Sequence, residues 1–341
     1  MTIDLRSDTV TKPTPAMVAA MVAAETGDDV YDEDPTVHRL EARVAEFLGH
    51  EAGLFTVSGS LANLLGVRSW VRPGHELVCE AQAHVVRAEM GAHAVLAGVT
   101  TRTWSDPKGQ VDLDAVRSVV TTDTGPFIVA TSAVAVENTH NFAGGTIQPM
   151  DRLEALRALL EPMQVKMHLD GARLWNAHVA TGTELDRYGS LFDTVSVCLS
   201  KGLGAPVGSV LVGPSDVIAE ARVWRKRLGG GWRQAGVLAA AGLYALDHHV
   251  DRLAEDHENA RLIAALIADA VPGVVNPTVP TNVILLTVGD RAAEVVAAAR
   301  DAGVLCGVVA PGVVRLITHL DVSRSEAKTA GTVLVDVLTR V

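Results

Sequence analysis

The first residue whose surroundings suggest chemistry is Lys201, which stands between two apolar, strand-forming runs in SVCLSKGLGAPVGSVLVG, residues 196–213. An ammonium group that is partly withdrawn from water loses proton affinity, and the resulting amine is a usable nucleophile. Asp170 is a second such residue, because it closes the apolar run VKMHLD and is followed by a glycine. Ligands bind at the carboxyl ends of the strands in an open α/β sheet, so we expect both groups at one site.

A candidate phosphate site adds to this pair. Ser58, Gly59 and Ser60 follow the apolar run AGLFTV and open a predicted helix. Free backbone N–H groups and the helix dipole both attract an anion at such a position. A lysine, a carboxylate and a phosphate cradle together fit pyridoxal phosphate. In that interpretation the lysine forms a Schiff base, and the carboxylate keeps the pyridine nitrogen protonated.

Each feature has a simpler interpretation when it is taken alone. Asp170 can end a strand in an ordinary turn, Ser58 can be a plain helix N-cap, and Lys201 can extend from a sheet edge into water. The run GLGAPVG, residues 202–208, also invites comparison with a dinucleotide fingerprint. Its glycine spacing differs from GxGxxG, and an apolar strand follows it, so we reject that interpretation.

Alternating strand-like and helix-like segments between about residues 50 and 215 must position these groups. Apolar, β-prone runs predict strands at 76–80, 127–137, 165–170, 194–200 and 208–213. Capping signals mark two of the expected helices: Asp34 with Pro35 begins the first, and Asp151 with Glu154 forms a predicted capping box in the second. The alternation predicts an α/β fold, with a mostly parallel sheet covered by helices on both faces.

The C-terminal third of the chain predicts a second, smaller unit. A long Ala/Leu-rich helix is expected from near Gln234 to beyond Ile267, and it leads into a strand, a helix, a strand and a closing helix. The proline- and glycine-rich run VPGVVNPTVP marks the transition. We divide the chain into an N-terminal arm (1–20), a large cofactor-binding domain (21–245) and a small C-terminal domain (246–341).

Composition excludes several classes of protein. Charges or glycines interrupt every apolar run before it reaches the length of a membrane span, and the start of the sequence lacks a secretory pattern. A net charge of −11 without a basic stripe argues against a nucleic-acid partner. The three cysteines are far apart and no HExxH motif occurs, so we expect neither disulfides nor a metal site. The cytosol is the expected compartment.

Eight sequence segments, which follow one another along nearly the whole chain, resemble the L-threonine aldolases. This is a family of pyridoxal-phosphate enzymes with the aspartate-aminotransferase type of fold. The segments are DLRSDTVTKPTPAM (4–17), VYDEDPTVHRLE (30–41), SGSLAN (58–63), ENTHN (137–141), HLDGARLWNA (168–177), LSKGLGAPVGS (199–209), GGGWRQAG (229–236) and RLITHLD (315–321). The resemblance implies a fold type I architecture: a large domain with a mostly parallel seven-stranded sheet flanked by helices, and a smaller C-terminal α/β domain.

The resemblance also implies roles for twelve residues. Lys201 would form the Schiff base, and His84 and His140 would be candidates for proton transfer. The residues expected to bind the cofactor are Ser58, Gly59, Ser60, His84, Asp170, Arg173, Lys201 and Arg233, the last from a neighbouring subunit. The residues expected to bind substrate are Ser7, Tyr31, His140, Arg173 and Arg315. Taken alone, the two histidines could be loop or core residues, and Arg173 and Arg315 could be structural ion-pair partners.

The reaction implied by the resemblance is aldol cleavage of L-threonine, L-allo-threonine and related β-hydroxy-α-amino acids to glycine and an aldehyde. The implied enzyme is a cytoplasmic homo-oligomer, a dimer of dimers with shared sites, that acts in threonine breakdown and glycine formation. Alternatives on the same scaffold are phenylserine cleavage, β-elimination and transamination. A non-catalytic cofactor-binding protein is a further alternative, and a nicotinamide dehydrogenase is the most distant one.

Overall fold

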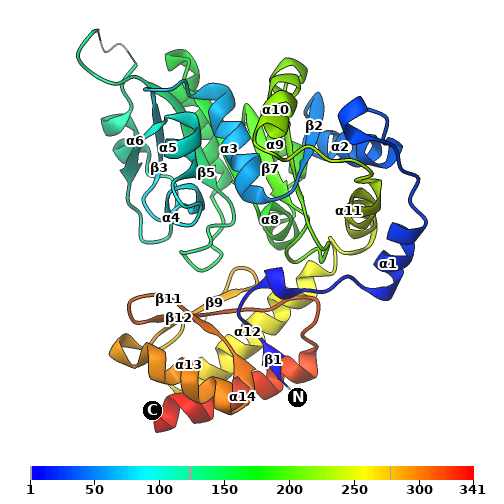
Figure 1. Cartoon of the computed structure of the whole chain (residues 1–341). Coiled ribbons are helices and arrows are strands. Elements are labelled where there is room, and N and C mark those ends of the chain that lie inside the picture. The colour runs from blue at the N-terminus through cyan, green and yellow to red at the C-terminus, as the bar shows by residue number, and fades with distance from the viewer. Residues whose placement is uncertain (1, 123–124, 277) are drawn as a thin grey trace.

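A central sheet organises the larger part of the molecule, as a computed structural model that describes residues 2–122, 125–276 and 278–341 shows (Figure 1). The strand order is β2-β8-β7-β6-β5-β3-β4. Only β8 runs antiparallel to its neighbours, which confirms the expected mostly parallel seven-stranded sheet. The strands are β2 (Ala52–Thr56), β3 (Glu76–Glu80), β4 (Thr100–Trp104), β5 (Thr131–Glu137), β6 (Lys166–Gly171), β7 (Thr194–Cys198) and β8 (Ser209–Gly213).

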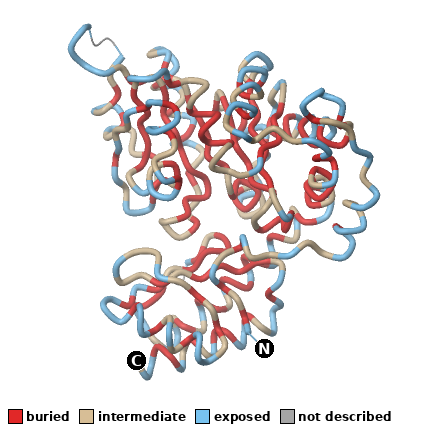
Figure 2. The backbone as a smooth tube through the Cα atoms, in the orientation of Figure 1, coloured by how far each residue is buried: buried red, intermediate tan, exposed pale blue. Residues whose placement is uncertain are grey.

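Helices cover both faces of this sheet, and the buried residues concentrate in the strands and in the helix faces turned toward them (Figure 2). They are α1 (Pro15–Val22), α2 (Pro35–Phe47), α3 (Gly59–Trp70), α4 (His84–Arg87), α5 (Ala92–Ala97), α6 (Leu113–Val119), α7 (Met150–Leu160), α8 (Leu174–Thr181), α9 (Leu185–Gly189), α10 (Ser215–Arg227) and α11 (Gly236–His248). Short 3-10 turns, η1 (Asp8–Val10), η2 (Asp29–Tyr31) and η3 (Glu161–Met163), join some of them.

The smaller part has its own hydrophobic core. It contains α12 (Leu253–Ala270), β9 (Val283–Thr287), η4 (Gly289–Arg291), α13 (Ala292–Asp301), β10 (Val304–Leu305), β11 (Gly307–Ala310), β12 (Val313–Ile317) and α14 (Arg324–Arg340). The chain start also belongs here, because β1 (Ile3–Asp4) pairs in parallel with β10. Ile3 and Leu5 therefore lie in the smaller core, while the boundaries of the three predicted segments remain a prediction.

Two predictions about helices were wrong. The long helix expected from Gln234 past Ile267 is two helices, α11 and α12, separated at residues 249–252. The capping box at Asp151 and Glu154 does not form, because α7 begins two residues earlier than such a box requires and Pro149 occupies its N-cap. The helix starting at Pro35 is confirmed, since the Asp34 side chain accepts hydrogen bonds from the amides of Thr36 and Val37.

Close contact between α3 and β6 brings the predicted phosphate cradle beside the predicted carboxylate. Gly66 of α3 faces the ring of His168 on β6, and a Cβ on this glycine would lie 2.4 Å from the His168 Cε1 atom. The helix can approach the sheet this closely only because residue 66 has no side chain. Both elements thus present their functional ends at the same edge of the sheet.

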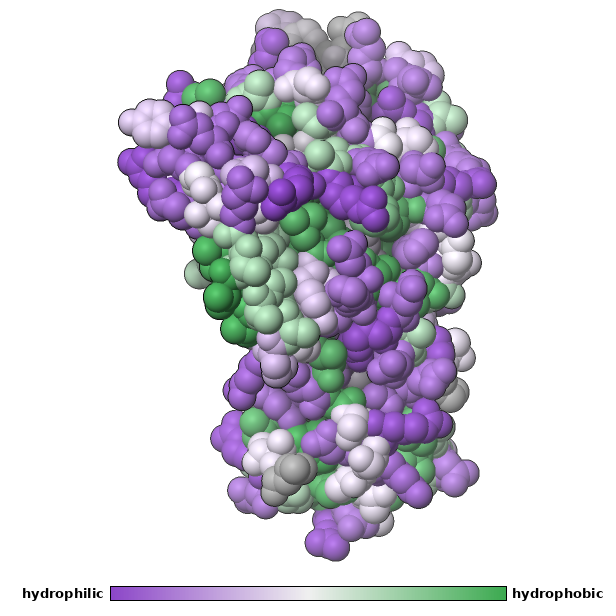
Figure 3. Space-filling model, turned by 90° about the vertical axis from the view of Figure 1, so that its right-hand side faces the viewer, coloured by the Kyte–Doolittle hydropathy of each residue, from purple (hydrophilic) through white to green (hydrophobic). Residues whose placement is uncertain are grey.

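The face that carries α1 and α11 exposes apolar side chains. This face lies on the right in Figure 1 and toward the viewer in Figure 3, where a hydrophobic area lies between hydrophilic ones. Val18 and Val22 of α1 and Val237 of α11 are exposed. Among the described helices, none combines the length and the apolar character needed to cross a membrane.

Candidate active site

A pocket of about 370 Å³ at the carboxyl end of the central strands brings together six residues that the sequence singled out. Ser58, Gly59, Ser60, His84, Asp170 and Lys201 all line it. Thr9 of the N-terminal segment and Asn63 of α3 line it as well. An amine, a carboxylate, an imidazole and a helix N-terminus therefore face one space.

Asp170 is held rigidly at the end of β6. The residue is buried, its Oδ2 accepts a hydrogen bond from Asn63 Nδ2 at 2.8 Å, and its Oδ1 accepts one from the amide of Ala172 at 3.1 Å. A buried carboxylate with both oxygens hydrogen-bonded keeps its orientation. It is placed to receive a protonated ring nitrogen.

The start of α3 leaves room for an anion. Ser58 is the N-cap, and its Oγ accepts a hydrogen bond from the amide of Leu61 at 3.2 Å. The first amides of this helix, with the dipole behind them, line the pocket wall. A Cβ at Gly59 would lie 2.9 Å from Cys198 Sγ, so only glycine fits between the helix start and β7. These residues fit a phosphate group.

Lys201 approaches the same space from the loop between β7 and β8. Its carbonyl oxygen accepts hydrogen bonds from the amide of Gly204 at 2.8 Å and from Thr11 Oγ1 at 3.1 Å. These two bonds fix the carbonyl group of the half-buried residue, while its side chain lines the pocket. The amine, Asp170 and the cradle fit pyridoxal phosphate by the chemistry of the three groups.

His84 begins α4 and is anchored by two glutamates. Its amide donates to Glu137 Oε2 at 2.7 Å, and its Nδ1 lies 2.9 Å from Glu89 Oε1. Burial lowers the pKa of His84, but the bond to Glu89 and the charges of Asp170, Glu89 and Glu137 outweigh this effect, so the pKa lies above its ordinary value. The imidazole is thus a strong proton acceptor at the pocket.

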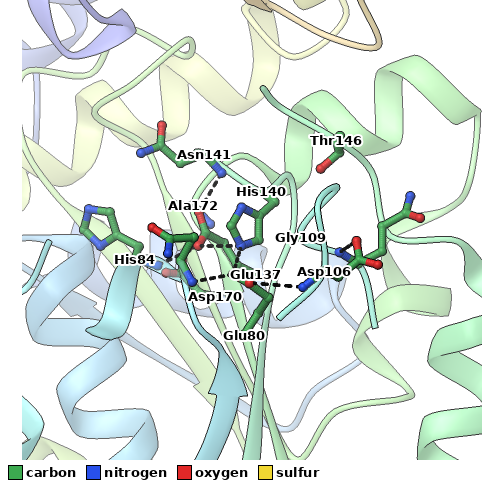
Figure 4. Close-up of polar contacts among 12 residues, drawn as sticks. Glu80, His84, Asp106, Gly109, Glu137, His140, Asn141, Thr146, Asp170 and Ala172 are labelled. Carbon is green, nitrogen blue, oxygen red and sulfur yellow. Dashed lines mark hydrogen bonds and ion pairs between the residues drawn. The ribbon is translucent and has the colours of Figure 1, made fainter. Parts of the chain in front are cut away.

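His140 does not line this pocket, and its expected position near a substrate hydroxyl stays a prediction. It is fully buried, its Nε2 lies 3.0 Å from Glu80 Oε2 and 3.9 Å from Glu137 Oε2, and Gly109 covers its ring. Figure 4 shows this cluster, with the His84 ring turned away from it. Glu137 contacts both residues, because its carboxylate lies near His140 Nε2 and accepts a hydrogen bond from the His84 amide.

The arginine expected to bind a substrate carboxylate, Arg173, is already paired. Its Nε and Nη2 donate to the two carboxylate oxygens of Asp8, both at 2.7 Å, and both residues are buried. Despite its burial, Asp8 has its pKa lowered to about 2, because the Arg173 charge and hydrogen bonds outweigh desolvation. Ser7 caps the short turn η1 by accepting a hydrogen bond from the Thr9 amide at 3.2 Å.

Arg315 has a different environment. Its Nη1 donates to Asn141 Oδ1 at 2.8 Å, and the same oxygen accepts from Arg173 Nη1 at 3.2 Å. Within the described residues its buried Nε has no hydrogen-bond partner. Burial, together with the nearby Arg173 charge, lowers the pKa of Arg315 to about 10. The Nε–H group of Arg315 can therefore donate a hydrogen bond to a bound anion.

Tyr31 and Arg233 lie together on the surface and do not line the pocket. The side chain of Arg233 is 62% exposed and its Nη1 donates to Asp28 Oδ2 at 2.9 Å, while Tyr31 is 72% exposed. The Arg233 carbonyl oxygen accepts a hydrogen bond from the Asp29 amide at 3.1 Å. Neither residue reaches the pocket of its own chain. Their expected contribution to the site of a neighbouring subunit stays a prediction.

Sequence reasoning missed Asp8 and Asn63 as site residues and left Glu89 open. Asp8 pairs with an arginine 165 positions away, and no local pattern announces such a contact. Asn63 lies four residues after Gly59 and three after Ser60, so it shares a face of the predicted helix with them, and it lines the pocket. That helical spacing was the available signal.

Comparisons with known proteins agree with this architecture. Solved structures of similar shape include a Leishmania major threonine aldolase (TM-score 0.85, 19% identity, 98% of this chain and 99% of that one). A Sphingomonas wittichii serine palmitoyltransferase gives a TM-score of 0.76 at 18% identity, over 98% of this chain and 87% of that one. The fold is that of fold type I pyridoxal-phosphate enzymes, as expected.

Residues 4–290 match the family model described as beta-eliminating lyase. Low specificity L-threonine aldolase of Escherichia coli K12 is 42% identical over 325 residues, 95% of this chain and 96% of that protein. Low-specificity L-threonine aldolase 1 of Arabidopsis thaliana is 41% identical, over 84% of this chain and 82% of that one. An uncharacterized Caenorhabditis elegans protein is 45% identical, and the match spans 65% of its length. The chain belongs to the beta-eliminating lyase family, and its resemblance to the L-threonine aldolases is confirmed.

Proposed function

We propose that this protein uses pyridoxal phosphate to cleave L-threonine, L-allo-threonine and related β-hydroxy-α-amino acids to glycine and an aldehyde. The observation that carries the proposal is the convergence of Lys201, Asp170 and the 58–60 cradle on one pocket. This convergence occurs in a chain that is 42% identical, over 95% of its length, to a protein named low specificity L-threonine aldolase.

Three groups would hold the cofactor. The Lys201 amine would bond its aldehyde carbon, Asp170 would receive its protonated ring nitrogen, and the amides of Gly59 and Ser60 would receive its phosphate. When bound, pyridoxal phosphate supplies a conjugated ring that accepts the electron pair of the broken Cα–Cβ bond. Lys201 would be the amine whose place the amino group of a substrate takes.

The remaining residues bind the substrate and move its proton. Arg315 would receive the substrate carboxylate and so fix the orientation of the substrate. The His84 Nε2 atom would accept the proton of the β-hydroxyl as the aldehyde departs, and the raised pKa of this imidazole makes it a better proton acceptor than an ordinary histidine. Arg173 supports this arrangement through Asn141, which contacts both guanidinium groups.

Substitution of the two arginines should have different consequences. In Arg315→Ala, we expect KM for threonine to rise by about 10- to 100-fold, because a charge-assisted hydrogen bond to the carboxylate is lost.

In Arg173→Ala, we expect the melting temperature to fall markedly, because the buried Asp8 carboxylate is left without its partner, a loss of roughly 3–5 kcal/mol. Saturation curves and thermal unfolding measure both effects, with the exposed Arg324→Ala as the control. Unchanged saturation in Arg315→Ala would remove Arg315 from the substrate site.

We also propose that the chain works as a homo-oligomer, with Tyr31 and Arg233 completing a neighbouring site and a dimer of dimers as the assembly. The exposed apolar side chains of α1 and α11 support such an interface. The cytoplasm is the proposed compartment, because the free, buried cysteines 79, 198 and 306 suit reducing conditions. The proposed role there is threonine breakdown with glycine formation.

One alternative has support of its own. The matching family model is described as beta-eliminating lyase, which favours β-elimination on the same scaffold as the second candidate. Elimination expels the β-hydroxyl of threonine as water and then gives a keto acid and ammonia by hydrolysis, whereas aldol cleavage of threonine releases acetaldehyde and glycine. The two reactions therefore differ in every product.

The purified protein tests this choice. We expect a yellow protein whose absorbance spectrum changes when threonine or glycine is added, and which releases acetaldehyde and glycine in equal amounts from L-threonine and L-allo-threonine. A panel with serine, phenylserine and a keto-acid acceptor separates elimination, phenylserine cleavage and transamination. A coloured protein that turns over none of these amino acids would instead be a cofactor-binding protein without catalysis.

A further inference from the structure

The chain bends sharply after α4 to place one acidic side chain behind the pocket. Met90 and Gly91 adopt left-handed backbone angles, with φ of 54° and 70°. Met90 is 94% exposed, whereas the side chain of Glu89, next to it, is only 2% exposed. A non-glycine residue in this region carries strain. The fold accepts that strain in a bend that turns a carboxylate inward.

This carboxylate contacts the imidazole that faces the pocket. Glu89 Oε1 lies 2.9 Å from His84 Nδ1. An ionised carboxylate only accepts hydrogen bonds, so Nδ1 must carry the hydrogen of this contact. In the neutral imidazole the lone pair is then on Nε2, and His84 lines the pocket. Glu89 thereby selects the tautomer that can take a proton from a bound molecule.

Asn63 fixes Glu89 from the other side. Its Nδ2 donates to Glu89 Oε1 and to Asp170 Oδ2, both at 2.8 Å. The amide cannot be reversed, because its oxygen would then face two carboxylates, which only accept hydrogen bonds. Its Oδ1 accepts a hydrogen bond from Ser196 Oγ at 2.5 Å and lies 3.2 Å from His168 Nε2. The two amide hydrogens are thus committed to the two carboxylates.

A metal ion is a weaker explanation of this cluster. Ligand atoms of His84, Glu89 and Asp170 lie within 4.8 Å of one another. A cation shared by the two carboxylates would have to take their oxygens from the Asn63 amide, whose hydrogens already occupy Glu89 Oε1 and Asp170 Oδ2. The Asn63 amide between the Glu89 and Asp170 carboxylates therefore favours a hydrogen-bonded network over a metal site.

We propose that Glu89 is a positioning residue that holds His84 with Nε2 as the proton acceptor and stabilises the imidazolium formed when the proton arrives. The inference rests on the proposed function and adds a residue to it. The charged groups that face His84 are Glu89, Glu137 and Asp170, and Lys201 lines the same pocket. Among these carboxylates, Glu89 is the one bonded to the imidazole ring.

Nuclear magnetic resonance of histidine in the full chain tests the arrangement without any turnover. In the cofactor-free wild type labelled with ¹⁵N-histidine, with the His84 signals identified by their loss in His84→Asn, we expect the neutral imidazole to be protonated at Nδ1. In Glu89→Gln we expect the His84 pKa to fall by about one unit, because a negative charge in contact is lost. The exposed Glu258→Gln should leave it unchanged. Protonation at Nε2 in the wild type, or an unshifted pKa in Glu89→Gln, would overturn the proposal.

Kinetics give the second measurement. We expect kcat of Glu89→Gln to fall by about 10- to 100-fold with little change in KM. The glutamine oxygen can still accept the Nδ1 hydrogen of neutral His84, but it carries no negative charge to stabilise the imidazolium. The acid limb of kcat/KM should move to lower pH by about one unit, because the base becomes weaker. A lower kcat with an unmoved acid limb would reduce Glu89 to a structural residue. If wild type cleaves no threonine, the proposed function fails, and the resonance experiment still decides the role of Glu89.

Discussion

Lys201→Ala is expected to abolish the absorbance band of the imine between the lysine and the cofactor, together with almost all turnover. The alanine variant keeps Asp170 and the phosphate cradle, so it should still bind the cofactor non-covalently. It lacks the amine that bonds the aldehyde and is exchanged for the substrate amine. Loss of a nucleophile of this kind costs on the order of 10³-fold or more in kcat.

The measurement is an absorbance spectrum of each protein with added pyridoxal phosphate, followed by an acetaldehyde assay. Lys328→Ala, an exposed lysine on α14, is the matched control and should keep both colour and activity. A Lys201→Ala protein that cleaves threonine at the wild-type rate would contradict the covalent scheme.

Asp170→Asn is expected to lower kcat by about 10²- to 10³-fold while the protein stays folded, by analogy with the loss of one preorganised electrostatic contact at a reacting centre. Asparagine has nearly the same shape and can keep the contact with the Ala172 amide. It carries no negative charge, so the ring nitrogen of the cofactor is no longer held in its protonated form. The cofactor then accepts electrons less readily.

A combination of spectrum, cofactor affinity and kcat measures this effect. Cofactor affinity should fall much less than kcat, since the cradle and Lys201 are unchanged. The exposed Asp336→Asn on α14 is the control, and its kinetics should match the wild type. Equal kcat values in Asp170→Asn and the wild type would show that this carboxylate does not act on the ring.

Local patterns predicted the elements that carry the main pocket. The run VKMHLD and the glycine after it marked the end of β6, because an apolar strand followed by Asp-Gly has few other interpretations. Edge strand β4 was missed, since its sequence TTRTW is polar and partly exposed, as edge strands are. Segment 127–137 gave a strand only from Thr131.

Contacts between distant segments explain what the sequence did not predict. The break between α11 and α12 has no proline or glycine; it coincides with the buried His249, whose Nδ1 lies 2.7 Å from the Leu203 carbonyl oxygen. The Asp8–Arg173 pair and the burial of His140 likewise depend on tertiary packing. A motif that resembles a family places a residue near a site, but only packing decides whether its side chain reaches the pocket.

The course of the first residues ties the two parts of the molecule together. Ile3 and Asp4 pair with β10 of the smaller part, Asp8 holds Arg173 of the larger part, and Thr11 holds the carbonyl oxygen of Lys201. The Lys12 amide then returns to Asp321. A movement of the smaller part relative to the larger one would therefore have to break these contacts or displace residues 3–12. Because Thr11 is bonded to the Lys201 carbonyl oxygen, such a displacement would also shift the loop that carries the reactive amine.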